Sequence, residues 1–403
     1  MYIRREAEQA LASLLKQYKV VLVTGPRQVG KSTMVNECLP DRFRRVTLDD
    51  PAMLSQAVAD RSLFFADHPL PLVIDEVQYA PQLFSYIKFL VDQGPERGVA
   101  VLTGSQTYQL MRGVRESLAG RVAVLELPGL SLRETMGRIG RGPFIPGQSR
   151  LAAEDVPQRP DVWHAIWRGC LPELQDPAMD WGQYYANYER TYLERDVRDL
   201  INPRDETAFY RFLVSCAART AQLLNYSSIA NDIDVDVKTV KSWVSVLETS
   251  GIVRIMQPYF SNTVKRLSKT PKIFFTDTGL ACHLLGWTNP EVLRKGAMAG
   301  ELFETFAVSE VLKSFQSAGR STRDVLFYRD ARKREIDLVV REGRVLHPIE
   351  IKKSSTPDRN MLKNFAALEE IADAEVGDGA VLCMVDRPFS IADRVKAVPI
   401  WCI

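Results

Sequence analysis

The chain has 403 residues, more than one hydrophobic core usually serves, so we expect about two or three domains. Its 46% hydrophobic and 25% charged residues exclude a disordered chain, and a net charge of +2 neither requires nor forbids a nucleic-acid partner. The six cysteines form no CxxC pair and the four histidines lack metal-ligand spacing, which excludes a disulfide framework and a zinc site. No segment reaches the roughly 18 apolar residues that span a bilayer, and we expect a cytoplasmic protein without a membrane anchor.

Short apolar strands alternate with helical segments in the first part of the chain. The strands are expected at residues 20–23, 71–74 and 99–102. Continuous apolar strands of this kind are typical of a parallel sheet that helices cover on both faces. The sequence becomes rich in Gly and Pro between residues 137 and 160, which indicates a loop, so we expect an α/β domain at residues 1–150.

A phosphate-binding loop follows the first strand. Its residues match G-x-x-x-x-G-K-[ST] at every fixed position, and a helical run comes after it. In such a loop backbone amides surround the phosphates, the lysine reaches the β- and γ-phosphates, and the hydroxyl ligates Mg²⁺. A chance match is the alternative, and the flanking strand and helix argue against it. The predicted ATP-binding residues are Gly25, Pro26, Arg27, Gln28, Val29, Gly30, Lys31, Ser32 and Thr33, with no specific role assigned to Arg27.

Two carboxylates end the second apolar strand. We expect Asp75 to hold the Mg²⁺ together with Ser32, and Glu76 to polarise the attacking water. An ordinary strand followed by a solvated acidic turn is the alternative. The third strand ends near Thr103 and Ser105, either of which is a candidate sensor of the γ-phosphate, with a plain turn as the alternative.

One arginine is a candidate for supplying charge to the transition state. Arg121 could act as an arginine finger on the nucleotide of its own subunit or of a neighbouring one. Arg112 and Arg115 compete for this role, and a structural ion pair or a solvated face is an equal alternative for Arg121.

Residues 151–295 are expected to form a helical region that contains a winged helix-turn-helix. Aromatic residues between 163 and 188, mostly three or four apart, indicate the core of helices and not a binding surface. Two short helical patterns follow between residues 226 and 248, and then a strand at 252–255. A protein-contact module is the alternative. The residues expected to meet DNA phosphates are Lys238, Lys241, Trp243, Lys265, Arg266 and Lys269.

Residues 296–403 are expected to form a separate α/β module, with a helix to about residue 315 and strands near 325–328, 335–340 and 345–352. Glu350 and Lys352 are two apart on a strand and therefore share one face, and Asp337 on the partner strand can lie beside Glu350.

Two carboxylates and a lysine that lie close together can form a metal-dependent site. Two converging carboxylates can hold Mg²⁺ and a lysine can stabilise charge at phosphorus, which is what metal-assisted phosphodiester cleavage needs, and Glu304 could add a ligand. The alternative is an exposed hairpin with alternating charge. Nearby cations suit a DNA backbone or a solvated turn equally well: Arg329, Arg332, Lys333 and Arg334.

Several motifs together resemble those of the prokaryotic AAA-type ATPases that carry a C-terminal domain of unknown function. These motifs are the phosphate loop and the segments at residues 74–78, 102–105, 118–121, 192–197, 275–280, 335–337 and 350–352. The resemblance implies an AAA-like core, a helical and winged-helix middle, and a C-terminal fold similar to PD-(D/E)xK restriction endonucleases. In that pattern Asp337, Glu350 and Lys352 match the D, E and K, and Glu304 matches the helix glutamate. No proline precedes Asp337, although the signature's name contains one.

We therefore expect an Mg²⁺-dependent ATPase whose nucleotide state controls DNA engagement, with metal-dependent nuclease activity as a possible property of the C-terminal module. The alternative is an ATP-driven signalling or scaffolding switch that acts on a protein partner and has an inactive nuclease-like module. A molecular motor is a third reading, and it would need a homo-oligomeric ring, a point on which the sequence is silent.

Overall fold

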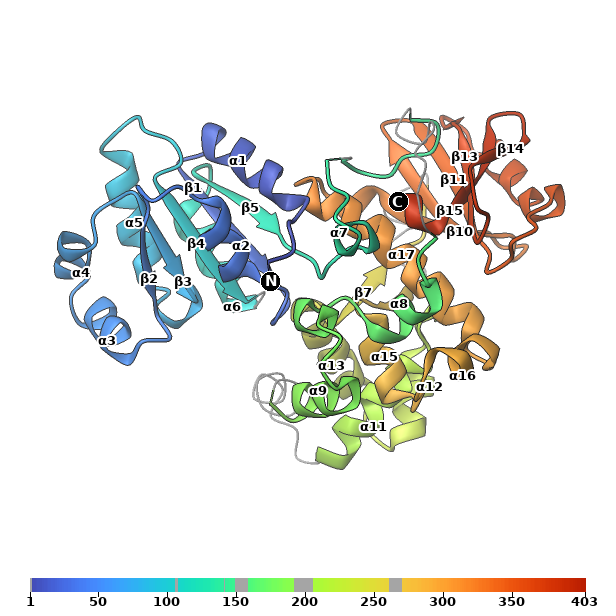
Figure 1. Ribbon diagram of the computed structural model, residues 1–403, viewed down its shortest axis with the longest axis horizontal. Coiled ribbons are helices and arrows are strands. Elements are labelled where there is room, and N and C mark those ends of the chain that lie inside the picture. The colour runs from blue at the N-terminus through green and yellow to red at the C-terminus, as the bar shows by residue number, and fades with distance from the viewer. Residues whose placement is uncertain (1, 106–107, 141, 149–158, 192–205, 261–269) are drawn as a thin grey trace.

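The computed structural model describes residues 2–105, 108–140, 142–148, 159–191, 206–260 and 270–403. Its three parts meet at one long helix, α17 (Ala299–Ser317) (Figure 1). The N-terminal part lies on the left of that view, the helical middle part lies below, and the C-terminal sheet lies at the upper right. Within the described residues no helix is both long and apolar enough to cross a membrane.

The N-terminal part is a five-stranded parallel sheet with the strand order β2-β3-β4-β1-β5. Its strands are β1 (Val20–Gly25), β2 (Arg44–Thr47), β3 (Leu72–Asp75), β4 (Ala100–Ser105) and β5 (Val122–Glu126). Its helices are α1 (Ala7–Gln17), α2 (Lys31–Cys38), α3 (Pro51–Ala59), α4 (Arg61–Asp67), α5 (Leu83–Asp92) and α6 (Tyr108–Leu118).

Alternate residues of β1 pack on opposite faces of this sheet. Val21 and Val23 belong to the core that α1 and α2 share, whereas Val20 and Leu22 belong to the core under α3, α4, α5 and α6. The predicted parallel sheet with helices on both faces is therefore confirmed. Because every strand runs in the same direction, the carboxyl ends of β1, β3 and β4 lie at the same edge of the sheet.

The middle part is mainly helical. Its elements are α8 (Val162–Arg168), η3 (Pro172–Gln175), α9 (Trp181–Tyr188), α11 (Glu206–Ala217), β6 (Gln222–Leu223), α12 (Tyr226–Ile233), α13 (Val237–Thr249), β7 (Val253–Met256), β8 (Lys272–Phe275), α15 (Thr278–Leu284) and α16 (Pro290–Lys295). The aromatic stripe is helix core, as predicted: Tyr184, Tyr185 and Tyr188 are buried, and Trp167 stacks on Trp181 with ring centroids 4.6 Å apart.

Helices α12 and α13 precede the antiparallel β7–β8 pair, and β6 pairs with β8 to complete a three-stranded sheet. The expected phosphate contact from Trp243 is wrong, because this side chain is only 5% exposed and packs edge-on against Phe209 and Phe212. A large indole on the inner face of α13 contributes to the core and is not available to a ligand. Lys238 and Lys241 are exposed on the same helix, and the other three predicted contacts, at residues 265, 266 and 269, lie outside the described residues.

The C-terminal part is a mixed sheet of seven strands with the order β14-β15-β13-β11-β10-β9, in which β12 also pairs with β11. Its strands are β9 (Val325–Arg329), β10 (Glu335–Glu342), β11 (Val345–Ile351), β12 (Glu375–Val376), β13 (Gly379–Cys383), β14 (Phe389–Ala392) and β15 (Val395–Pro399). Four short 3₁₀ helices also belong to this part: η5 (Thr322–Asp324), η6 (Arg359–Leu362), η7 (Phe365–Leu368) and η8 (Ile400–Cys402). Two short elements lie earlier in the chain, η1 (Val77–Tyr79) after β3 and α7 (Leu132–Thr135) after β5. The predicted helix and the three predicted strands of this part are confirmed.

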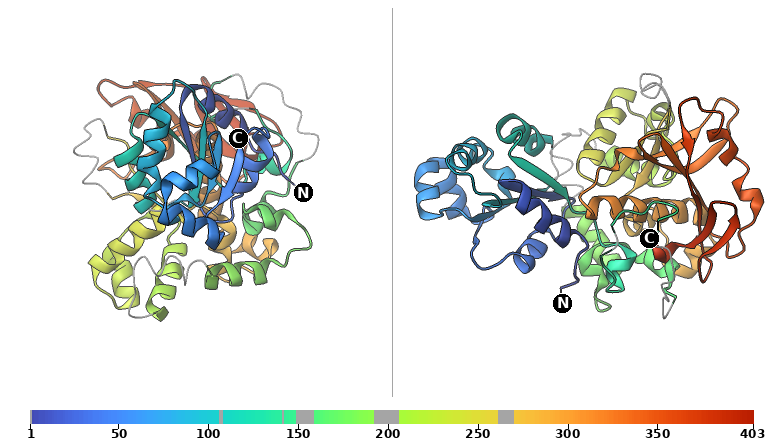
Figure 2. Two further views of the ribbon diagram at one scale, coloured as in Figure 1. Left: turned by 90° about the vertical axis from the view of Figure 1, so that its left-hand side faces the viewer. Right: turned by 90° about the horizontal axis from the view of Figure 1, so that it is seen from above.

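Helix α17 connects all three parts of the molecule. It contacts α1 and β5 of the first part, α8 and β8 of the middle part, and β11 of the last part. The second view in Figure 2 likewise shows α17 between the N-terminal and C-terminal sheets. One hydrophobic core runs through all three parts and includes Phe144 and Ile145, which follow the first sheet in the chain. The N-terminal sheet ends at β5, and the predicted domain limit at residue 150 stays a prediction.

Candidate functional site

The phosphate loop needs its glycines for steric reasons. Gly25 has φ 153°, and a Cβ atom at this position would overlap the carbonyl oxygen of Leu127. Gly30 has φ 86° in the left-handed region and is the residue that precedes α2. The loop therefore turns sharply between β1 and α2, and the N-terminus of α2 with its unpaired amides lies at the end of the loop.

Lys31 is held over the loop by backbone oxygens. Its Nζ donates to the carbonyl oxygen of Gly25 at 3.1 Å and to that of Pro26 at 2.8 Å, and the residue is 6% exposed. Burial lowers the pKa of Lys31 to about 8, and the carboxylates of Glu76 and Asp75 partly oppose this shift. An ammonium whose partners among the described residues are two neutral carbonyls is poised to exchange them for phosphate oxygens.

Ser32 and Asp75 lie against each other, as the sequence predicts for two magnesium ligands. Ser32 Oγ donates to Asp75 Oδ1 at 2.6 Å, and the hydroxyl of Thr103 donates to the same oxygen. The three side chains border a hollow of about 460 Å³, part of it open to solvent, which Asn36 and Thr47 also line. The donor set is composed of hydroxyl and carboxylate oxygens, which fits a hard cation such as Mg²⁺.

Glu76 follows Asp75 in an uncommon backbone conformation, with φ 54°. The amide of Gln78 donates to its carboxylate, and its own backbone N–H donates to Thr103 Oγ1 at 3.4 Å. A left-handed glutamate at the end of a strand is strained and is typical of functional positions. The position of Glu76 beside Lys31 and Asp75 is consistent with the predicted water-polarising role, which stays a prediction.

Thr103 and Ser105 differ in their surroundings, although both were candidate sensors. Thr103 is in the Asp75 cluster. Ser105 pairs with Gly25 in the β1–β4 register and is buried, and its Oγ has no hydrogen-bond partner among the described residues. The geometry therefore gives Thr103 a direct place beside the predicted metal ligands, and a role for Ser105 stays a prediction.

Arg121 does not lie near the phosphate loop of its own chain. It precedes β5, and its backbone oxygen accepts from the N–H of Val20 at the amino end of β1, the opposite edge of the sheet from the loop. Its guanidinium pairs with Asp92 at 2.6 Å. The arginine-finger role of Arg121 on the nucleotide of its own chain is thus wrong, because the two lie at opposite edges of the sheet. The ion pair that was the alternative is present, and a role toward a neighbouring subunit stays a prediction.

Arg27 of the loop is close enough to Lys31 for its positive charge to lower the pKa of Lys31.

Two further residues bind the phosphate loop from distant parts of the chain. Arg5, 2% exposed, donates to the carbonyl oxygens of Val29 at 2.8 Å and Pro128 at 2.7 Å, and its Nε lies 3.1 Å from Glu134 Oε1. Tyr184 on α9 donates to Gln28 Oε1 at 2.6 Å. Neither contact has a signal in the sequence, because Arg5 lies 24 residues from Val29 and Tyr184 lies 156 residues from Gln28.

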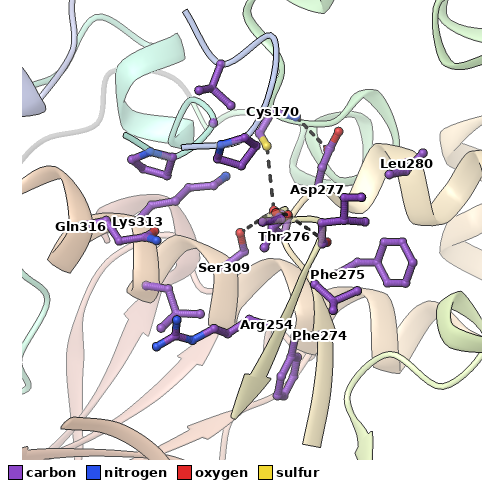
Figure 3. A pocket seen from close by; sticks show the side chains of 18 of the residues that line it. Cys170, Arg254, Phe274, Phe275, Thr276, Asp277, Leu280, Ser309, Lys313 and Gln316 are labelled. Atoms are coloured by element: carbon purple, nitrogen blue, oxygen red, sulfur yellow. Dashed lines mark hydrogen bonds between the residues drawn. The ribbon is translucent and has the colours of Figure 1, made fainter. Parts of the chain in front are cut away.

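The loop also borders a cavity of about 890 Å³, part of it open to solvent, between the N-terminal part, the β7–β8 pair and α17 (Figure 3). Pro26 and Val29 of the loop form part of its wall. Figure 3 shows Cys170 and Ser309 both directed at Thr276, whose carbonyl oxygen accepts from Ser309 Oγ at 2.9 Å. The phosphate loop is thus in direct contact with space that the middle part and α17 also enclose.

In the C-terminal part the three predicted residues come together. Lys352 Nζ lies 2.7 Å from Glu350 Oε1 and 3.3 Å from Asp337 Oδ2, and the backbone N–H of Ile351 also donates to Asp337 Oδ2 at 2.8 Å. The β9–β10 register shifts between Ile336 and Val339, and such a bulge re-aims the side chains within it. Asp337 lies inside this bulge, so the local backbone directs it toward Glu350.

The carboxyl group of Glu350 is buried with one oxygen atom left without a hydrogen bond among the described residues. The residue is 7% exposed, and the oxygen atom in question is Oε2. Burial first, and the neighbouring Asp337 second, raise the pKa of Glu350 to about 7. An unpartnered carboxylate oxygen beside a second carboxylate is a position where a cation would be stabilised.

Glu304 lies near that group, since Asp337 helps to raise the pKa of Glu304 and Glu304 helps to raise that of Glu350, and its role as a third carboxylate ligand stays a prediction. Lys272 of β8 binds Glu304 Oε1 at 2.9 Å and Glu335 Oε1 at 2.7 Å. Within the described residues no group of three or more His, Cys, Asp or Glu side chains is arranged to hold a metal ion. The physical reason is that the carboxylate of Glu304 is directed at a lysine from another part of the chain, and no local pattern of residues records that contact.

The predicted basic patch near β9 and β10 is partly neutralised. Arg329 pairs with Glu335, and Arg334 pairs with Asp330 and with Glu370. Arg332 and Lys333 are exposed at the tip between the two strands. Only the tip of this hairpin therefore retains cations in full contact with solvent.

Comparison with known proteins agrees with this division of the chain. Residues 17–136 match the model of a family described as an AAA domain, residues 159–291 match "Domain of unknown function (DUF8612)", and residues 299–403 match "Domain of unknown function (DUF4143)". The first part of the chain is thus similar to AAA domains and is followed by two further matched regions, and the expected resemblance is confirmed to this extent. The finer expectations, a winged helix and an endonuclease-like fold, are not part of these matches.

The chain is also homologous to two mycobacterial proteins. These are uncharacterized protein Rv2008c of Mycobacterium tuberculosis and uncharacterized protein Mb2031c of Mycobacterium bovis, each 28% identical over 405 residues, which cover 98% of this chain and 83% of the relative. Among solved structures, AMPPCP-bound DnaA from Aquifex aeolicus matches with a TM-score of 0.29 and 14% identity over 60% of this chain and 85% of that one. A single-residue variant of RuvB from Thermotoga maritima matches with a TM-score of 0.30 and 15% identity over 65% and 93%.

Proposed function

We propose that the protein binds ATP with Mg²⁺ at residues 25–33 and hydrolyses it. The observation that carries this proposal is the contact of Ser32 with Asp75 beside Lys31, since a P-loop NTPase requires these three groups together. Ser32 and Asp75 would hold the magnesium ion, whose charge would offset that of the phosphate oxygens. Lys31 would leave its carbonyl partners and bind the β- and γ-phosphates.

Glu76 would act on the water. Its carboxylate accepts a hydrogen bond from Gln78, which orients it, and its other oxygen atom would accept a proton from the attacking water. Thr103 orients Asp75 through the hydroxyl contact and would act as the polar group that faces the γ-phosphate.

ATP turnover by the Lys31→Ala variant tests the proposal. We expect loss of at least about 100-fold in kcat, because one buried transition-state contact is typically worth that factor. Lys16→Ala is the matched control, since Lys16 is exposed at the end of α1. Turnover by Lys31→Ala at the wild-type rate would show that hydrolysis occurs elsewhere.

We further propose that the middle part is a winged helix and that it engages DNA. The order α11, β6, α12, α13, β7, β8 with its three-stranded sheet supports this assignment. The exposed Lys238 and Lys241 of α13 are the phosphate-binding candidates. DNA binding that weakens steeply with salt, and weakens further in the doubly substituted Lys238→Ala, Lys241→Ala protein, is expected. Binding of a protein partner with little salt dependence would favour the switch that is the alternative function.

The C-terminal part supports a second candidate activity, metal-dependent cleavage of a phosphodiester. Its basis is the cluster of Asp337, Glu350 and Lys352, in which one buried oxygen of Glu350 has no partner among the described residues. Nicking of plasmid DNA with Mn²⁺ that is lost in Asp337→Ala is the expected result. Equal nicking by both proteins would assign the activity to a contaminant, and no nicking by either would favour an inactive nuclease-like module.

A further inference from the structure

A lysine from the middle part is inserted into the acidic cluster of the C-terminal part. Lys272 lies at the centre of the three-stranded sheet, where its backbone pairs with Leu223 on one side and Met256 on the other. Its side chain is 4% exposed and binds both Glu304 and Glu335. The ammonium also lies 5.5 Å from the centre of the Phe327 ring on β9. The cation therefore belongs to one part of the chain by its backbone and to another by all of its side-chain contacts.

The backbone of the two parts is joined at the same place. The segment after β7 runs beside β9, where Pro258 and Phe327 form a parallel bridge and the N–H of Tyr259 donates to the carbonyl oxygen of Phe327 at 2.6 Å. A separation of the β7–β8 pair from the C-terminal sheet would break this bridge and withdraw Lys272 from Glu335 of β10. The position of Lys272 thus depends on how the two parts are docked.

The charges of the cluster do not balance. Its carboxylates are Glu304, Glu335, Asp337 and Glu350, and its cations are Lys272, Arg329 and Lys352. One carboxylate is in excess among these described groups, and Glu350 is among the buried ones. Replacing the single charge of Lys272 with a divalent cation would balance the charges of the cluster. The unpartnered Oε2 atom of Glu350 would then coordinate that cation.

We propose that Lys272 is a built-in substitute for a divalent cation: it occupies the acidic cluster while the middle part is docked, and a metal ion binds to Glu304, Asp337 and Glu350 only when the Lys272 contact is given up. The proposal rests on the second candidate activity, since both use the same cluster. It adds that Lys272 of the middle part blocks the cluster, and that docking of the middle part controls whether a metal ion can bind there.

The test measures metal binding without nucleotide, so that it does not depend on cleavage or on the phosphate loop. Mn²⁺ is titrated into the full-length protein and followed by the electron paramagnetic resonance of free Mn²⁺. Lys272→Met should bind Mn²⁺ about tenfold more tightly than wild type, because one charged hydrogen-bond contact no longer competes. Lys295→Met is the matched control, since Lys295 is exposed on α16 and its loss should leave Mn²⁺ affinity unchanged. Adding Asp337→Asn to Lys272→Met should abolish the gain.

A second variant covers the case in which Lys272→Met does not fold. Lys272→Gln removes the competing charge but keeps a polar side chain that can donate to Glu304 and Glu335, so it should increase Mn²⁺ affinity in the same direction by a smaller factor. The melting temperature of each folded variant should rise with Mn²⁺ more than that of wild type. Equal Mn²⁺ binding by wild type and the variants, lost in Asp337→Asn, would overturn the role of Lys272 while leaving the metal site in place. No Mn²⁺ binding by any of the proteins would overturn both.

Discussion

Ser32 at the start of α2 and Asp75 at the end of β3 are 43 positions apart in the chain, yet the serine hydroxyl donates a 2.6 Å hydrogen bond to the carboxylate. Parallel strands bring their carboxyl ends to the same edge, and the insertion of β4 between β1 and β3 leaves room for Thr103 to join the pair. The side chains that face the proposed metal are thus arranged before any nucleotide arrives. Such preorganisation reduces the cost of assembling the site during turnover.

Glu76→Gln should separate binding from hydrolysis. The amide keeps the size of the side chain but cannot accept a proton from water, so ATP affinity should stay within about twofold of wild type while the single-turnover rate falls by about 100-fold or more. Rapid-quench measurement with excess enzyme gives that rate directly. An unchanged rate would move the water-activating role to another residue.

ATP binding should be accompanied by proton uptake. Because burial lowers the pKa of Lys31 to about 8, part of the protein carries a neutral lysine at pH 8, and the bound phosphates favour the ammonium. We expect uptake of roughly half a proton per site at pH 8 and little at pH 6.5. Calorimetry in buffers of different ionisation enthalpy measures it. Lys31→Arg is the control, since its guanidinium stays charged at both pH values.

Arg5→Ala and Arg4→Ala should differ widely in their effect on stability. Arg5 is a buried partner of Glu134, and its removal leaves that carboxylate without its cation, which should lower the free energy of unfolding by about 3–5 kcal/mol. Arg4 forms an exposed pair with Glu8, and its removal should cost about 0.2–0.5 kcal/mol. Urea denaturation of the two variants makes the comparison. Similar losses would mean that the Arg5 contacts to the phosphate loop contribute little.

Glu350→Gln should change how stability depends on pH. The pKa of Glu350 is about 7 in the folded protein against an ordinary value of 4.5, so its contribution is fully present below pH 4.5 and is lost as the pH rises through 7. Glutamine cannot ionise. The free energy of unfolding of the variant relative to wild type should therefore shift in its favour by on the order of 1–3 kcal/mol between pH 5 and pH 8. Denaturation at several pH values tests the sign, and a constant difference would contradict it.

The features that sequence alone could predict are those encoded locally. The phosphate loop, the strand that ends at Asp75 and the alternation around Glu350 each lie within a few residues, so spacing and strand periodicity are sufficient. Their convergence also follows, since parallel strands and a short hairpin leave little choice of partner.

Other features depend on contacts between distant segments, which no local pattern records. Lys272 has the sequence pattern of an ordinary strand residue, yet tertiary packing directs its ammonium at Glu304. Trp243 shares its helix with two exposed lysines, and only the position of α11 decides that the indole faces inward. The location of Arg121 at the amino edge of the sheet could be inferred from strand direction, because it precedes β5 by one residue.

Helix α17 has a practical consequence for anyone who divides this chain at its family limits. A fragment that began at residue 299 would retain the helix but would lose the surfaces of α1, β5, α8 and β8 that cover it. Phe303, whose ring centroid lies 5.9 Å from that of Trp163 on α8, would then lose this cover and be exposed to solvent. Such a fragment should aggregate. The C-terminal part is therefore better studied through point variants of the 403-residue chain.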